Sequence, residues 1–226
     1  MSTPRLIVFD VDGTLIDSQL VIIKAMATAY RAVGLPVPSD AQTLSIVGLS
    51  LPEAMRGISP EIDEATVDAL VKAYRETFVE QRKSGHGEAA VPLYQGARAC
   101  LLRLKESPFH VLGAATGKAR RGLDVVIETH NLGGLFTTLQ TADLHPSKPH
   151  PSMLEAACAE TGIDPEHAVM IGDTSFDMEM GKAAGFSTIG VAWGYHELDR
   201  LGVHADRTVH HFDEVGPTID ALLGAV

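Results

Sequence analysis

The sequence predicts an α/β protein, in which a Rossmann-like parallel sheet has helices on both faces and carries an inserted all-helical domain. Two observations predict this fold. Short, continuous apolar runs, typical of strands buried on both faces, alternate with segments of helical periodicity. This alternation stops between residues 17 and 90, where helical periodicity continues without an intervening strand.

The predicted strands begin with the run RLIVF at 5–9, which the acidic sequence DVDGT follows directly. Similar runs occur further along the chain, at 109–115, 168–172 and 187–192, with a weaker one at 207–212. Helical segments lie between or after these runs, at 97–106, 118–131, 151–161, 177–184 and 214–223. Strands that alternate with helices in this way indicate a parallel sheet with helices on both faces.

The segment that interrupts the alternation is predicted to fold separately. Apolar residues recur at helical spacing near both of its ends. The predicted domains are an α/β core of residues 1–16 and 91–226 and a helical insert of residues 17–90. We expect the insert to hinge near residues 16–18 and again in the loop 84–96, through which the chain returns to the core.

The composition is that of an ordinary globular protein, with 45% hydrophobic and 21% charged residues and a net charge of -11. This acidic balance argues against nucleic acid or an anionic membrane surface as a partner. No apolar run approaches the roughly 20 residues of a membrane span, and the N-terminus lacks a signal-peptide pattern. Cys100 and Cys158 lack CxxC spacing, so we expect free thiols in a cytoplasmic protein. The expected partner is a small molecule, bound by a monomer or a homodimer.

Polar residues follow several of the predicted strands. They are two acids after the first strand, a hydroxyl and a glycine after the second, a lysine in LHPSKPHP and two acids after AVMIG: Asp10, Asp12, Thr116, Gly117, Lys148, Asp173 and Asp177. We expect these groups to lie together, because ligands bind beyond the carboxyl ends of parallel strands. Two carboxylates about 4 Å apart repel by on the order of 4 kcal/mol at an effective dielectric of roughly 20, so a cation is expected among them.

These residue types predict phosphoryl chemistry assisted by a metal ion. Carboxylate oxygens are the ligands that Mg²⁺ prefers. A lysine, a hydroxyl and backbone N–H groups hold a phosphate. Together they describe a metal-assisted phosphoryl site.

Four motifs in order, DVDGT, ATGK, SKPHP and GDTSFDM, resemble those of the haloacid dehalogenase-like hydrolases. The resemblance extends from Arg5 to about Ala192. It is to the phosphatase branch with a helical cap inserted after the first motif, similar to the phosphoglycolate phosphatases. It implies a Mg²⁺-dependent phosphomonoester hydrolase that works through an aspartyl-phosphate.

The resemblance divides the four acids between chemistry and metal binding. Asp10 would be the nucleophile, and Asp12 would be the general acid for the leaving oxygen and later the base for water. Asp10, the backbone carbonyl of Asp12, and Asp173 would bind Mg²⁺. Asp177 would support the metal-bound waters or orient the lysine of the third motif.

The remaining candidate residues would bind the substrate. By the same resemblance, Thr116 and the amide of Gly117 would bind phosphoryl oxygens, and Lys148 would neutralise the nucleophile and the phosphate. In the insert, SLPE at 50–53 has the form of a capping box and predicts a helix that starts at Ser50. The resemblance places the preceding loop, Gly48 and Leu49, over the active site. We expect Gly48 and Ser50 to face a small phosphorylated acid, with 2-phosphoglycolate the leading candidate, unless Ser50 only caps its helix.

Other interpretations of single motifs fit less well. A calcium loop that starts at Asp10 needs glycine and glutamate where Leu15 and Val21 stand. GAATGK has three residues between its glycines, whereas a Walker loop has four. The basic residues after the second strand are interpreted as a solvated helix face; they are Lys118, Arg120 and Arg121. Trp193 is interpreted as a packing residue.

Rival functions are distinguished by particular residues. Dehalogenases of this family lack the second acid, which is present here as Asp12. A beta-phosphoglucomutase-like phosphotransferase shares all four motifs, but it carries basic residues where Val47 and Leu51 flank the insert loop. A catalytically silent binding protein of the same fold would have lost Asp10, Asp12 or Lys148, all of which are present.

Overall fold

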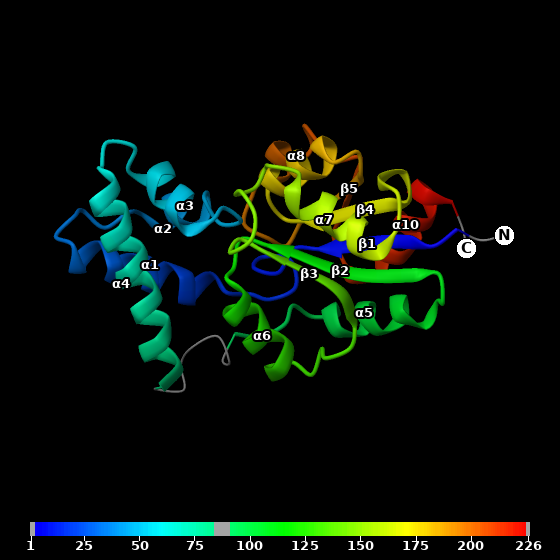
Figure 1. Ribbon diagram of the computed structural model, residues 1–226, viewed down its shortest axis with the longest axis horizontal. Coiled ribbons are helices and arrows are strands. Elements are labelled where there is room, and N and C mark those ends of the chain that lie inside the picture. Colours follow the sequence, from blue (N-terminus) through cyan, green and yellow to red (C-terminus); the bar gives the residue numbers. More distant parts are fainter. Residues whose placement is uncertain (1–2, 84–90, 225–226) are drawn as a thin grey trace.

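The computed structural model describes residues 3–83 and 91–224 and contains a six-stranded, fully parallel sheet in the order β3-β2-β1-β4-β5-β6 (Figure 1). The strands are β1 (Arg5–Phe9), β2 (His110–Thr116), β3 (Phe136–Thr141), β4 (Ala168–Gly172), β5 (Ser187–Val191) and β6 (Arg207–Val209). The predicted α/β class and parallel sheet are confirmed.

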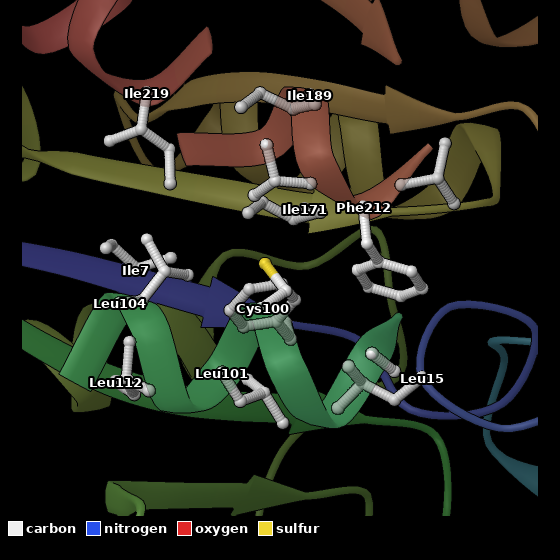
Figure 2. Packing of buried hydrophobic residues seen from close by; sticks show 14 of the residues in the cluster. Ile7, Leu15, Cys100, Leu101, Leu104, Leu112, Ile171, Ile189, Phe212 and Ile219 are labelled. Atoms are coloured by element: carbon white, nitrogen blue, oxygen red, sulfur yellow. The ribbon is translucent and has the colours of Figure 1, made fainter. Parts of the chain in front are cut away.

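Helices cover both faces of this sheet. One face carries α5 (Ala97–Glu106), α6 (Arg120–Thr129) and α10 (Val215–Leu223), and the other carries α7 (Ser152–Thr161) and α8 (Ser175–Ala183). A short helix, α9 (Leu198–Leu201), follows β5. Ile7 of β1 packs with Leu101 and Leu104 of α5 (Figure 2), whereas its neighbours Leu6 and Val8 face α7. The run RLIVF is continuously apolar because both faces of its strand are buried.

The described residues between β1 and α5 form four helices: α1 (Gln19–Ala32), α2 (Asp40–Leu44), α3 (Leu51–Ile58) and α4 (Glu64–Lys83). They pack around an apolar cluster of their own, which includes Met26, Tyr30, Met55, Leu70 and Tyr74. In Figure 1 they lie beyond the carboxyl ends of the central strands. We call α1–α4 the cap. All regular elements among its described residues are helices, as predicted.

Two expectations about the cap and its connections remain untested. Residues 84–90 of the predicted return loop lie outside the described residues, so the boundary at residues 90 and 91 stays a prediction. The hinges stay a prediction as well. No helix in the described part of the chain is both long and apolar enough to cross a membrane.

The strand β3 was missed in the sequence because its residues, FTTLQT, are largely polar. The buried polar side chains satisfy one another: Gln140 Nε2 donates to Thr138 Oγ1 at 2.7 Å, and that hydroxyl donates to Glu160 of α7 at 2.5 Å. Burying polar groups is tolerated when they are hydrogen-bonded. The last strand is also shorter than predicted, since β6 ends at Val209.

Candidate active site

The acids that follow β1 and β4 lie together at the carboxyl edge of the sheet. The register pairs Phe9 with Ala114 of β2 and with Ile171 of β4. Asp10 follows Phe9 directly, and Asp173 lies two residues after Ile171. Both side chains are buried. Neighbouring parallel strands that end at the same level therefore bring two distant motifs to one site.

A buried lysine lies among these acids. Lys148, in the loop between β3 and α7, has its Nζ 2.8 Å from Asp10 Oδ1 and 2.6 Å from Asp177 Oδ1. Burial alone favours a neutral amine, but the two carboxylates outweigh it and raise the pKa of Lys148. Part of the positive charge expected among the acids is thus the ammonium group of Lys148.

Asp177 also begins the helix α8. Its Oδ2 accepts hydrogen bonds from the backbone N–H and the hydroxyl of Thr174, at 3.1 and 2.7 Å, and Thr174 Oγ1 accepts from the Asp177 N–H. This is a capping box. The side chain of Asp177 therefore both caps α8 and contacts Lys148, the lysine that it was expected to orient.

Asp173 is held in place by two donors from other segments. Thr14 Oγ1 donates to its Oδ1 at 2.9 Å, and the backbone N–H of Tyr195 donates to its Oδ2 at 2.9 Å. Thr14 belongs to the turn after β1, where Gly13 has φ +86°. A Cβ at Gly13 would lie 2.2 Å from Asp173 Oδ2, so only glycine allows this close approach.

The cluster of acids fits a divalent cation. Asp10, Asp173 and Asp177 can offer ligand oxygens that lie within 4.8 Å of one another. Asp10 Oδ2 is buried and accepts no hydrogen bond from the described residues. Burial, opposed by Lys148, raises the pKa of Asp10 to about 7, and burial raises the pKa of Asp173 well above its ordinary value. A hard cation would relieve both the unpartnered oxygen and the excess negative charge.

The environment of Asp12 corrects the interpretation of Lys118 as part of a solvated helix face. The helix α6 begins only at Arg120, and the turn before it directs Lys118 inward. Lys118 Nζ lies 3.2 Å from Asp12 Oδ2 and 5.8 Å from the ring centroid of Phe78 in α4, and the lysine side chain is 10% exposed. Lys118 therefore links the candidate general acid of the core to the cap. Arg120 and Arg121 are exposed, as expected.

The residues predicted to bind phosphoryl oxygens lie beside the acids. Thr116 is buried at the end of β2, and its Oγ1 accepts a hydrogen bond from the Lys118 N–H at 3.1 Å. A Cβ at Gly117 would lie 2.5 Å from the carbonyl oxygen of Gly48 and 2.6 Å from that of Leu49, so the cap loop lies directly against this glycine. Gly48, Thr116 and Gly117 line one cavity together with Asp10 and Asp12.

Ser50 occupies a different place. It lines a neighbouring cavity of about 910 Å³ that also includes Lys148, and its backbone N–H donates to Ser147 Oγ at 2.8 Å. The expected helix does begin after Ser50, but the capping box does not form among the described residues. Glu53 instead pairs with Arg56 at 2.7 Å. Ser50, which was expected to face a small phosphorylated acid, thus has its backbone N–H engaged by Ser147.

A segment after β5, residues 193–196, contacts the turn after β1, Asp173, the start of α8 and the cap, and the sequence had indicated only a packing role for Trp193. Trp193 packs against Phe212, as expected, and its Nε1 donates to the Thr14 carbonyl at 3.0 Å. The Tyr195 hydroxyl lies 3.0 Å from both the N–H and the hydroxyl of Ser18 in the predicted hinge. His196 Nε2 lies 3.1 Å from the carbonyl oxygen of Ser45 in the cap. The signal for this segment was its position, an aromatic loop at a strand's carboxyl end.

We expect the contact between His196 and the cap to make stability depend on pH. The Ser175 N–H donates to Nδ1, so the neutral ring donates from Nε2 to Ser45. Burial, with help from Arg200, lowers the pKa of His196 to about 4. The contribution of this buried neutral ring to the free energy of unfolding is fully present above the ordinary histidine pKa of about 6.5 and is lost as the pH falls towards 4. Relative to His196→Gln, the wild type should lose about 2 kcal/mol of unfolding free energy between pH 7 and 4, measured by urea denaturation. Parallel pH profiles would contradict a buried neutral histidine.

The comparison with known proteins agrees with this geometry. The model of a family described as "Haloacid dehalogenase-like hydrolase" matches residues 7–191. The chain belongs to this family. The resemblance seen in the four motifs is therefore confirmed, and the matched residues of this haloacid dehalogenase-like hydrolase run from β1 to β5.

Individual relatives match this haloacid dehalogenase-like hydrolase over almost its full length. A protein named "Probable phosphatase IndB" from Dickeya dadantii is 33% identical over 222 residues, which cover 96% of this chain and 94% of that protein. A protein named "Phosphoglycolate phosphatase" from Vibrio cholerae is 28% identical and covers 99% of both chains. A solved haloacid dehalogenase-like hydrolase from Streptococcus pneumoniae, 23% identical, shares the fold with a TM-score of 0.82 over 96% of this chain and 99% of its own.

Proposed function

We propose that the protein is a Mg²⁺-dependent phosphomonoester hydrolase that acts through an aspartyl-phosphate on a small phosphorylated metabolite. The observation that carries this proposal is the position of Asp10. One of its oxygens is 2.8 Å from a buried ammonium group, and the other is without a donor among the described residues at the floor of the cavity under the cap. The phosphatase names of the two relatives support the same reaction.

The proposed phosphoryl transfer has two steps. In the first, Asp10 attacks phosphorus, the bond between phosphorus and the ester oxygen breaks, and Asp12 donates a proton to the leaving alkoxide. In the second, Asp12 takes a proton from water, which attacks the acyl-phosphate and releases inorganic phosphate and free Asp10. Splitting one difficult displacement into two lowers the barrier of each.

In both steps, negative charge on the transferring phosphoryl group would be stabilised by cationic and hydrogen-bonding groups of the site. The ammonium group of Lys148 contacts Asp10, and both side chains are buried from solvent. Thr116 and the Gly117 amide would donate to the transferring oxygens. Asp10, the Asp12 carbonyl and Asp173 are the proposed metal ligands, with Asp177 as the orienting residue for Lys148. The charge of a bound Mg²⁺ would offset the repulsion between the carboxylates and the phosphate.

From the sequence, 2-phosphoglycolate is the leading candidate substrate, and the name of the Vibrio relative supports this candidate. The alternative of a beta-phosphoglucomutase-like phosphotransferase has less support, because Val47 and Leu51 supply no positive charge at the cap loop. The silent binding protein is the alternative from another class. Hydrolysis of p-nitrophenyl phosphate in the presence of Mg²⁺ distinguishes it from an enzyme, and a panel of phosphate esters then ranks the substrates.

We infer a cytoplasmic setting from the two cysteines, both free thiols.

Removing the metal should abolish turnover and lower stability. EDTA is expected to remove activity, Mg²⁺ to restore it and Ca²⁺ to restore it poorly, because Ca²⁺ takes more ligands at longer distances. Mg²⁺ should also raise the unfolding temperature of the wild type, since it would bind only the folded cluster of acids. This rise should be missing in Asp173→Ala. Activity that survives excess EDTA would show that the metal proposal is wrong.

A further inference from the structure

We propose that the substrate is a phosphomonoester with a small apolar leaving group, such as an aromatic or branched aliphatic alcohol, that binds under the cap. This inference rests on the proposed phosphatase activity and names its substrate class. It follows from the cavity that extends from Asp10 and Asp12 into the cap, and it points away from 2-phosphoglycolate.

The cavity is continuous with the proposed chemistry. Its volume is about 250 Å³, and its core side is formed by Asp10, Asp12, Thr116, Gly117 and Lys118. A phosphoryl group attacked by Asp10 therefore leaves its ester oxygen and the attached group in this cavity. Pockets for drug-sized ligands measure roughly 300 to 1,000 Å³, so a leaving group of modest size is indicated.

The cap side of the cavity is almost entirely apolar. It is lined by aliphatic and aromatic side chains from α1, the loop before α3, α3 itself and α4: Ile22, Met26, Ile46, Val47, Leu49, Leu51, Ala54, Tyr74, Phe78 and Val79. Several are buried against one another in the cap cluster. Such a wall stabilises an apolar group by removing it from water, and it offers no compensation for desolvating a carboxylate.

The positive charges near the cavity do not form an evident carboxylate site. Lys118 already pairs with Asp12. Arg75 and Arg121 line the cavity but are exposed. The substrate carboxylate was expected to face the helix turn that starts at Ser50, but the Ser50 N–H donates to Ser147 Oγ, and Ser50 lines the neighbouring cavity. The carboxylate of 2-phosphoglycolate, two bonds from the ester oxygen, would therefore enter a cavity whose cap wall is mostly apolar and whose two unburied cations, Arg75 and Arg121, are exposed to solvent.

The test compares benzyl phosphate, ethyl phosphate and 2-phosphoglycolate with the wild-type enzyme and Mg²⁺. All three release a primary alcohol, so the comparison reports binding of the leaving group more than its reactivity. We expect kcat/KM for benzyl phosphate to exceed both others by about tenfold, as is typical of apolar groups in apolar pockets. If 2-phosphoglycolate is hydrolysed as efficiently as benzyl phosphate or better, the apolar proposal is overturned and the phosphatase proposal stands.

Binding of phosphonates separates this inference from the phosphatase proposal. 2-Phenylethylphosphonate and 3-phosphonopropionate are the non-hydrolysable analogues of benzyl phosphate and 2-phosphoglycolate, and calorimetry measures their affinities without turnover. If no ester is hydrolysed, the phosphatase proposal fails. The preference of the cavity for an apolar group beside the phosphoryl group then holds, as a property of a ligand site, if the phenyl compound binds about tenfold more tightly. It fails if the carboxylate compound binds equally well or better.

Two cap variants and a matched control assign the preference to this cavity. Leu51→Arg places a cation in its wall, and Phe78→Ala removes a ring; both should lower the ratio of kcat/KM for benzyl phosphate to that for 2-phosphoglycolate by about tenfold. Leu102→Arg makes the first change on α5 at a 40% exposed position outside the cavity, and should leave the ratio unchanged. An unchanged ratio in both cap variants would overturn the assignment.

Discussion

Asp10→Asn should retain the fold and lose phosphatase activity by roughly 1,000-fold or more, as is usual when a nucleophile is removed. An amide cannot form an acyl-phosphate, and the other carboxylates of the cluster, among the described residues, are engaged by other groups. Asp12 points towards Lys118, and Asp177 is engaged with Lys148 and Thr174. Activity is measured with p-nitrophenyl phosphate at saturating Mg²⁺, and the fold by circular dichroism and thermal unfolding.

A matched control is available in the same loop. Asp17 is exposed, and Asp17→Asn removes the same charge from the protein without touching the buried cluster. It should keep activity within about twofold of the wild type, as surface substitutions usually do. Residual activity of Asp10→Asn above roughly 10% of wild type would remove Asp10 from the role of nucleophile.

The sequence predicted the strands and residues of the site that follow from short-range patterns. β1 and β4 are continuous apolar runs, and each is followed directly by its acids. Register between neighbouring parallel strands then brings Asp10 and Asp173 together without further information. The ion pair between Lys148 and Asp10 also agrees with the expectation that a cation lies among the acids.

What the sequence did not predict depends on tertiary contacts between polar groups. The buried polar residues of β3 are tolerated because Gln140 donates a hydrogen bond to Thr138 inside the protein, and no apolar pattern in the sequence predicts such a strand. Lys118 turns inward because Asp12 and Phe78 lie there, although a lysine before a helix is usually solvated. Glu53 leaves its capping position for Arg56. In each case a partner distant in the sequence, or one of several local partners, decides the outcome.

Lys148→Met should cost both activity and stability. Methionine matches the length of the lysine chain, so packing is nearly conserved, but Asp10 and Asp177 lose the cation between them. Breaking a buried ion pair by removing one partner costs about 3 to 5 kcal/mol of unfolding free energy. We expect a loss of this size in urea denaturation with EDTA present, and a fall in kcat of several orders of magnitude.

The double variant Lys148→Met/Asp177→Asn separates the two losses. Asparagine keeps an oxygen for the Thr174 N–H and hydroxyl but carries no charge, so one uncompensated charge disappears. The double variant should recover more than half of the lost stability, because the two substitutions are coupled through one buried pair. It should recover no activity, since Asp10 still lacks its neighbouring cation during attack. Equal stability of the single and double variants would contradict the proposed pairing.

The pH dependence of the single variant gives an independent check of the same pairing. Burial already raises the pKa of Asp10 to about 7 in the wild type, with Lys148 opposing that effect. Without Lys148 the pKa must rise further, so the folded protein holds a proton that the unfolded chain releases above about pH 4. A raised carboxyl pKa destabilises the folded state increasingly as pH rises. The stability deficit of Lys148→Met relative to wild type should therefore be larger near pH 8 than near pH 5, and a deficit independent of pH would mean that lost packing, not unpaired charge, causes it.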